Sequence, residues 1–149
     1  MICPDVNLLL YAVHEDYPEH AKAKRWLESV LSAAAPVALL HVVVLGFVRL
    51  STHRKIFSQP LTVEEALNVV DGWLAMPNVR WVSPGGQHWE LLKENLRDAG
   101  TAGSLTTDAH IAAVAAEFGL IVHTNDADFG RFAGIKWVNP LTSRKSQLS

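Results

Sequence analysis

The 149-residue sequence has little cysteine, little net charge and few long apolar runs. Cys3 is its only cysteine, so no internal disulfide can form, and we expect the protein to work in a reducing compartment. The formal net charge of −2 indicates no basic surface for nucleic acid. The longest apolar stretch, 37–50, contains His41 and Arg49 and is shorter than the roughly 20 residues that cross a bilayer.

Several functional motifs are also missing. The first residues carry no Lys or Arg, and Asp5 interrupts the first apolar run, so we expect no secretory signal and a cytoplasmic protein. The histidines show no His-Glu-x-x-His spacing, which disfavours a zinc site. No Gly-x-x-x-x-Gly-Lys-Ser loop and no Gly-x-Ser-x-Gly elbow occurs, which argues against the common nucleotide-binding and serine-hydrolase classes.

The chain does contain an alternation of short apolar runs and longer amphipathic segments. Strands are expected at 1–3, 37–40, 79–82, 120–123 and 135–138. Helices are expected at 6–13, 18–31, 41–51, 62–75, 87–99 and 108–118. Thr62 and Glu65 form a capping box at the start of the fourth helix. The alternation predicts an α/β fold with a mostly parallel sheet, in one domain over residues 1–141 with a polar, flexible tail at 142–149.

Three aspartates stand at the ends of these elements. Asp5 follows the first strand, Asp108 opens the 108–118 helix, and Asp126 follows the 120–123 strand. That helix rises about 16 Å and the strand about 13–16 Å, so both acids return to the same rim of the sheet. In a parallel sheet Asp5 lies on that rim too, where open α/β sheets bind ligands. Because clustered carboxylates repel one another, the pattern predicts a divalent metal site.

Each aspartate also has an ordinary structural explanation. Asp5 could cap the helix that follows Pro4, Asp108 could favour a helix start, and Asp126 could be a turn residue. Asp128 could be a fourth ligand or the cap of the short turn 128–132. Since oxygen ligands dominate the set, Mg²⁺ or Mn²⁺ is the expected cation.

Neighbouring polar residues are candidates to support the acids. Asn7 could orient Asp5 or simply cap a helix, and the hydroxyls of Thr107 and Thr124 could hold the adjacent carboxylates. Thr107 could equally be a plain cap, and Thr124 could be there for its strand propensity. His110 lies one turn into its helix, where packing is a better interpretation than general-base catalysis.

Aromatic and basic residues carry less information. The tryptophans are expected to be core and helix-packing groups rather than base-stacking platforms; they are Trp26, Trp73, Trp81, Trp89 and Trp137. Arg49, Arg54 and Lys55 surround Ser51-Thr-His and could contact an RNA backbone or an acidic partner. A solvated loop is the simpler interpretation of these basic residues.

Five segments together resemble the PIN-domain family, and within it the VapC-type toxins of bacterial toxin–antitoxin modules. They are Asp5-Val-Asn-Leu-Leu-Leu-Tyr-Ala, Leu45-Gly-Phe-Val-Arg-Leu-Ser-Thr-His, Gly103-Ser-Leu-Thr-Thr-Asp-Ala-His-Ile-Ala-Ala, Thr124-Asn-Asp-Ala-Asp-Phe-Gly-Arg-Phe and Trp137-Val-Asn-Pro-Leu. One such segment is weak evidence, whereas all five in this order are specific. The resemblance covers nearly the whole chain, from Met1 to Leu141.

The resemblance implies a three-layer α/β/α sandwich and an acidic pocket that binds Mg²⁺ or Mn²⁺. It also implies an endoribonuclease that hydrolyses structured RNA such as tRNA or rRNA, is neutralised by a cognate antitoxin, and commonly forms homodimers. Many members carry a Glu in a Glu-x-x-Arg-like segment, where this chain has Gly46-Phe-Val-Arg49. The resemblance therefore makes Asp5, Asp108 and Asp126 the catalytic and metal-binding set, with Asp128 as a possible addition.

Two alternatives remain open from the sequence. Because Gly46 replaces an acid, the chain could be a PIN-like module that binds RNA or protein with weakened catalysis. It could also be another metal-dependent phosphohydrolase. The haloacid-dehalogenase type would require Asp-x-Asp after the first strand, and Asp5-Val-Asn7 does not match that pattern.

Overall fold

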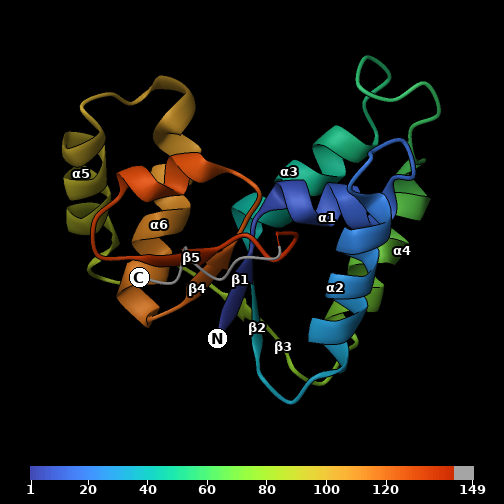
Figure 1. Ribbon diagram of the computed structural model, residues 1–149, viewed down its shortest axis with the longest axis horizontal. Helices are drawn as coiled ribbons and strands as arrows, with labels where there is room; N and C mark the ends of the chain where they lie inside the picture. Colours follow the sequence, from blue (N-terminus) through green and yellow to red (C-terminus); the bar gives the residue numbers. More distant parts are fainter. Residues whose placement is uncertain (143–149) are drawn as a thin grey trace.

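The computed structural model describes residues 1–142, which build a parallel sheet between two layers of helices (Figure 1). The strands are β1 (Ile2–Pro4), β2 (Val37–Leu40), β3 (Val79–Val82), β4 (Ile121–His123) and β5 (Lys136–Val138). Their order in the sheet is β3-β2-β1-β4-β5, and every neighbouring pair is parallel. The expected α/β/α sandwich is confirmed, with a sheet that is parallel throughout.

Helices cover both faces of the sheet. They are α1 (Val6–Val13), α2 (His20–Ser32), α3 (His41–Ser51), α4 (Val63–Leu74), α5 (His88–Ala99) and α6 (Thr106–Phe118), with short 3₁₀ turns η1 (Gly103–Leu105) and η2 (Ala127–Arg131). In Figure 1, α1 to α4 lie on one side of the sheet, and α5 and α6 lie on the other. Among residues 1–142, no helix combines the length and apolar character that crossing a membrane requires.

The core is centred on β2 and α6. All four residues of β2 are buried, as expected for a strand with helices on both faces. Helix α6 is buried on most sides, with five consecutive buried residues at 111–115, because α5 covers its outer face. All five are small or β-branched (Ile111, Ala112, Ala113, Val114 and Ala115), which lets the helix pack closely between the sheet and α5.

Most expected elements are present, with shifts at their ends. Strand β1 extends through Pro4, one residue further than expected, because a proline that donates no hydrogen bond is tolerated at a strand end. The capping box of Thr62 and Glu65 is confirmed at the start of α4. The expected cap of α6 at Thr107 or Asp108 is wrong: a 3₁₀ turn leads into the helix, which begins at Thr106. The segment 143–149, most of the expected flexible tail, lies outside the described residues.

The strand order determines where a ligand site can form. Strand β1 lies at the centre, with β2 on one side and β4 on the other, so the direction of winding reverses at β1. Ligands of open α/β sheets bind at the carboxyl ends of the strands beside such a reversal. In this chain those ends are Asp5, directly after β1, and Thr124, directly after β4.

Candidate metal centre

Asp5 is held in a buried position at the end of β1. Its backbone N–H donates to the carbonyl of His123 at 2.9 Å, which continues the pairing of β1 with β4. Its carboxylate accepts from the Val6 backbone N–H at 2.7 Å and so caps α1. Only 3% of Asp5 is exposed. The capping role considered from the sequence is therefore real, but the capping bond uses only Oδ1.

The second oxygen of Asp5 is held by Thr124, which is fully buried. Thr124 Oγ1 donates to Asp5 Oδ2 at 2.8 Å and accepts from the Asp126 backbone N–H at 3.0 Å. Asn7 Nδ2 donates to Thr124 Oγ1 at 3.2 Å, and to Asp5 Oδ2 at 3.4 Å. One hydroxyl thus ties the end of β1 to the loop that carries Asp126.

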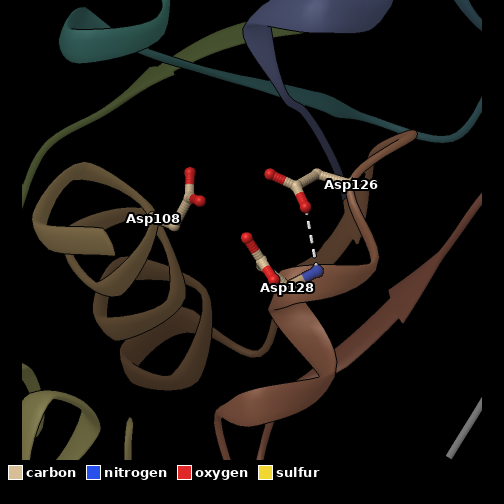
Figure 2. A group of neighbouring side chains, drawn as sticks. All are labelled: Asp108, Asp126 and Asp128. Carbon is tan, nitrogen blue, oxygen red and sulfur yellow. Dashed lines mark hydrogen bonds between the residues drawn. The ribbon is translucent and has the colours of Figure 1, made fainter. Parts of the chain in front are cut away.

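Three carboxylates gather in front of this network. One oxygen from each of Asp108, Asp126 and Asp128 lies within 4.8 Å of the others. Figure 2 shows the three side chains converging: Asp108 from the first turn of α6, Asp126 from the loop after β4, and Asp128 from η2. Asp126 Oδ1 also accepts from the Asp128 backbone N–H at 2.9 Å, so Asp126 both caps η2 and positions Asp128.

Electrostatics favour a cation at this place. Burial, together with the charges of Asp5, Asp126 and Asp128, raises the pKa of Asp108 to about 7. Burial also raises the pKa of Asp5, and the Asp126 charge adds to this, although hydrogen bonds from Thr124 and Val6 act in the opposite direction. Carboxylates that lower one another's acidity in this way are stabilised by a divalent ion.

A cavity of about 520 Å³ opens beside the acids, between α3 and the start of α6. Asp5 and Asp108 lie in its wall, together with Thr107. Gly46 of α3 lines the same cavity, so the position at which the resemblance leads us to expect a Glu does face the acids. A Cβ on Gly46 would meet Val6 Cγ2 at 3.4 Å, which is an ordinary contact.

The structure sorts the candidate residues into groups. It brings Asp108, Asp126 and Asp128 together and leaves Asp5 outside that trio, where it influences Asp108 through its charge. Thr124 and Asn7 contact Asp5, whereas Thr107 is exposed and lines the cavity.

His110 takes part in packing between helices. Its Nδ1 lies 2.8 Å from His88 Nε2 of α5, so its ring is engaged by the neighbouring helix rather than by an aspartate. Burial, and then the His88 charge, lower its pKa.

The sequence interpretation missed Asn125. Its backbone N–H donates to Asn7 Oδ1 at 3.2 Å, and its Oδ1 accepts from Asn139 Nδ2 at 2.7 Å. Asn125 thereby links the first turn of α1 to the segment after β5. Its place directly before Asp126 was the available signal, but the partner Asn139 is fourteen residues away and only the fold brings it near.

The donor set fits Mg²⁺ or Mn²⁺. All ligand atoms on offer are carboxylate oxygens, which hard divalent cations prefer, and no sulfur or imidazole belongs to the trio. The exposed position of Asp128 leaves an approach from solvent. Asp108, Asp126 and Asp128 are thus the residues that could hold one ion.

Comparisons with known proteins show which family the chain resembles. The PIN domain family model matches residues 2–135. Ribonuclease VapC33 of Mycobacterium tuberculosis is 38% identical over 141 residues, covering 95% of this chain and 99% of the relative. Ribonuclease VapC37 of the same organism is 41% identical over 136 residues, covering 91% and 94%.

Solved structures show the same fold. The crystal structure of Mycobacterium tuberculosis VapC20, described as a sarcin-ricin loop cleaving toxin, has a TM-score of 0.67 at 19% identity and covers 91% of this chain and 97% of its own. VapBC2 from Rickettsia felis, bound to a DNA fragment from its promoter, has a TM-score of 0.66 at 18% identity and covers 93% and 98%.

Proposed function

The chain belongs to the PIN domain family, and from that premise we propose that it is a metal-dependent endoribonuclease toxin that a cognate antitoxin neutralises. The curated relatives at 38% and 41% identity are named ribonucleases, and each is matched over nearly its whole length. The observation that carries the proposal is the convergence of Asp108, Asp126 and Asp128 at the rim where the sheet reverses its winding.

The proposed reaction is hydrolysis of an RNA phosphodiester. A bound Mg²⁺ or Mn²⁺ would supply Lewis acidity, which acidifies water and offsets phosphate charge. Asp108 and Asp126 provide the inner carboxylates, and Asp128 is the exposed member that can orient the attacking water. Asp5 adds negative charge that favours the cation, while Thr124 keeps its side chain in place. The cation also offsets the acidic rim, which would otherwise repel a polyanion.

The finer parts of the proposal concern substrate and partners. We propose structured RNA, tRNA or rRNA, as the substrate class, a cognate antitoxin as the inhibitor, a homodimer as the assembly and the cytoplasm as the location. Support comes from the relatives: VapC20 is described as cleaving the sarcin-ricin loop, and VapBC2 is a toxin–antitoxin pair. The catalytic set remains Asp5, Asp108 and Asp126, with Asp128 as an additional metal ligand.

The test is cleavage of total tRNA and rRNA by the purified protein. We expect cleavage with Mg²⁺ or Mn²⁺, none with EDTA, and a loss of at least about 100-fold in Asp126→Asn. Asp71→Asn, which changes an exposed acid on α4, should cleave like the wild type. Equal cleavage by the wild type and Asp126→Asn would overturn the assignment of the trio.

A second candidate, a catalytically weakened binding module, is favoured by one observation. Gly46 lines the cavity without the acid that the family resemblance leads us to expect. Such a module would bind RNA equally with or without metal and would cleave none of it, so the same assay, run beside a binding measurement, separates the two functions.

A further inference from the structure

Two of the five tryptophans do not pack in the core. Trp81 is 45% exposed and Trp89 is 62% exposed, so the core part of the expectation is wrong for both. Trp89 lies on α5, beneath the Lys93 ammonium at 5.9 Å. Trp81 lies on the edge strand β3, and its neighbour is the imidazole of His41.

The indole of Trp81 is stacked on the imidazole of His41. Their ring centroids are 4.3 Å apart and their planes differ by 11°. Because His41 covers one face of the indole, an exposed fraction of 45% requires that much of the remaining ring surface is open to solvent. The pair therefore presents a flat, rigid aromatic surface whose orientation is already set.

This surface lies on the same rim as the aspartates. His41 follows β2 directly, as Asp5 follows β1, and Trp81 is the next-to-last residue of β3. In the sheet order, β3 is two positions from β1, about 10 Å away at the usual strand spacing. A short single-stranded segment can span such a distance.

The cavity lies next to His41: its lining begins at Val42 and reaches Asp5 and Asp108. Leu45 lies one helical turn after His41, on the same side of α3, and is 68% exposed. It lines the cavity whose other wall contains Asp5 and Asp108. Arg49 follows one turn later in the same wall and takes part in neither ion pair found within residues 1–142, Lys24–Glu28 and Lys93–Glu90.

We propose that the His41–Trp81 pair is a stacking platform for an unpaired nucleobase of the RNA substrate, a few nucleotides away from the bond that is cleaved. The inference rests on the proposed nuclease function and names a specificity-determining part of the same site. The RNA backbone runs from the platform through the α3 cavity, past the Arg49 guanidinium, to the acidic trio. Stacking tolerates every base, so the platform selects unpaired nucleotides rather than a particular sequence.

An RNA occupant fits these features better than a protein does. The aromatic pair, the Arg49 guanidinium in the cavity wall and the carboxylate trio offer contacts for the base, the phosphate and the scissile bond of a nucleotide chain. A protein partner would be the better interpretation of an apolar surface without these charged groups.

The first experiment measures binding of fluorescein-labelled decaadenylate RNA by polarisation, in Mg²⁺ and on an Asp126→Asn background that prevents cleavage. Adding Trp81→Leu is expected to weaken binding by roughly 5- to 100-fold, as for loss of one stacked base. Trp81→Phe should restore most of the affinity because it keeps an aromatic face. Trp89→Leu is the matched control, an exposed tryptophan in the opposite helical layer, and should bind unchanged.

The second experiment compares cleavage of total tRNA and rRNA by the wild type and Trp81→Leu, together with melting temperature and sedimentation. The platform predicts a lower kcat/KM with unchanged melting and assembly. If the wild type and Trp81→Leu cleave RNA equally well, the platform proposal is wrong and the nuclease proposal stands. If Trp81→Leu instead changed the sedimentation coefficient and left RNA binding unaltered, the surface would be a protein interface. If the wild type cleaves no RNA but still binds it in a way that depends on Trp81, the nuclease proposal is wrong and the platform proposal stands.

Discussion

Gly46 is the residue at which this chain departs from the pattern that its family resemblance implies. It lines the cavity that also contains Asp5 and Asp108, and a Cβ at this position would make only an ordinary contact with Val6. A longer side chain can therefore extend towards the acids without displacing the backbone. The absence of an acid here is a property of the sequence and not a consequence of crowding.

We therefore predict that Gly46→Glu raises the affinity for Mn²⁺, on the order of tenfold, because ligand charge sets the affinity of oxygen sites for divalent ions. Calorimetric titration measures this directly. Gly46→Gln is the control, since both variants gain about 1 kcal/mol of helix propensity relative to glycine and only one adds charge. Equal Mn²⁺ affinity in the Glu and Gln variants would show that position 46 does not reach the cation.

Thr124 is the buried hydroxyl on which the geometry of Asp5 depends. Its Oγ1 donates to Asp5 and accepts from the Asp126 backbone. Thr124→Val keeps the shape of the side chain but leaves Asp5 Oδ2 with only the long hydrogen bond from Asn7 Nδ2. We therefore expect a loss of about 1–3 kcal/mol in unfolding free energy. Urea denaturation measures the loss, and Thr124→Ser should recover most of it. A Thr101→Val change, at an exposed position, should be neutral; if Thr124→Val were equally neutral, the hydroxyl would not support Asp5.

At the scale of elements, the start of α4 shows what a local signal determines. Thr62 Oγ1 accepts from the Glu65 backbone N–H at 3.1 Å, and the Glu65 carboxylate accepts from the Thr62 backbone N–H at 2.9 Å. We predict that Thr62→Ala lowers the unfolding free energy by about 1 kcal/mol, or roughly 2–4 °C in melting temperature, and leaves RNA cleavage unchanged. Thr62→Ser should retain the cap. A change in cleavage rate would mean that α4 has a role in the site.

Other elements were also predictable from the sequence alone where their signals are local. The capping box, the glycine that ends α6 and the buried run of β2 depend on neighbours in sequence, and their patterns predicted them. The rim position of Asp108 and Asp126 also followed, because one helix and one strand of matched length connect them. The 3₁₀ turn starts after Ala102 and α6 starts after Leu105. Neither residue caps its helix with a side chain, so no local pattern predicted the turn.

Contacts between distant segments were beyond sequence reasoning. The hydrogen bond from Asn139 to Asn125 and the stack of His41 on Trp81 each depend on strand order, which the amino-acid pattern does not reveal. The distinction between Asp5, held by Thr124, and the trio that faces solvent is equally a product of tertiary packing. These contacts form only when the strand order brings distant segments together, so local sequence patterns could not predict them.

At the scale of the whole molecule, a chain with a net charge of only −2 places four of its fifteen acidic residues together at one rim. Without a cation this concentration opposes folding. The pKa of Asp108 is about 7 in the folded protein, above its ordinary value of 3.8. A group with a raised folded pKa contributes stability that is present at low pH and is lost as the pH rises through the folded value. The metal-free protein should therefore lose stability between about pH 4 and pH 7.

Metal binding reverses this trend, because a cation needs the deprotonated carboxylates and binding releases protons. We predict that 1 mM Mg²⁺ raises the melting temperature more at pH 8 than at pH 6, as measured by differential scanning fluorimetry. Asp108→Asn removes the titrating group, so its metal-free form should melt higher than the wild type at pH 8 and show little further shift with Mg²⁺. Asp71→Asn, at an exposed site on α4, should follow the wild type at both pH values. A Mg²⁺ shift that is equal at pH 6 and pH 8 would mean that Asp108 is already ionised at pH 6, so that its contact with Asp5, Asp126 and Asp128 does not set the charge of the site.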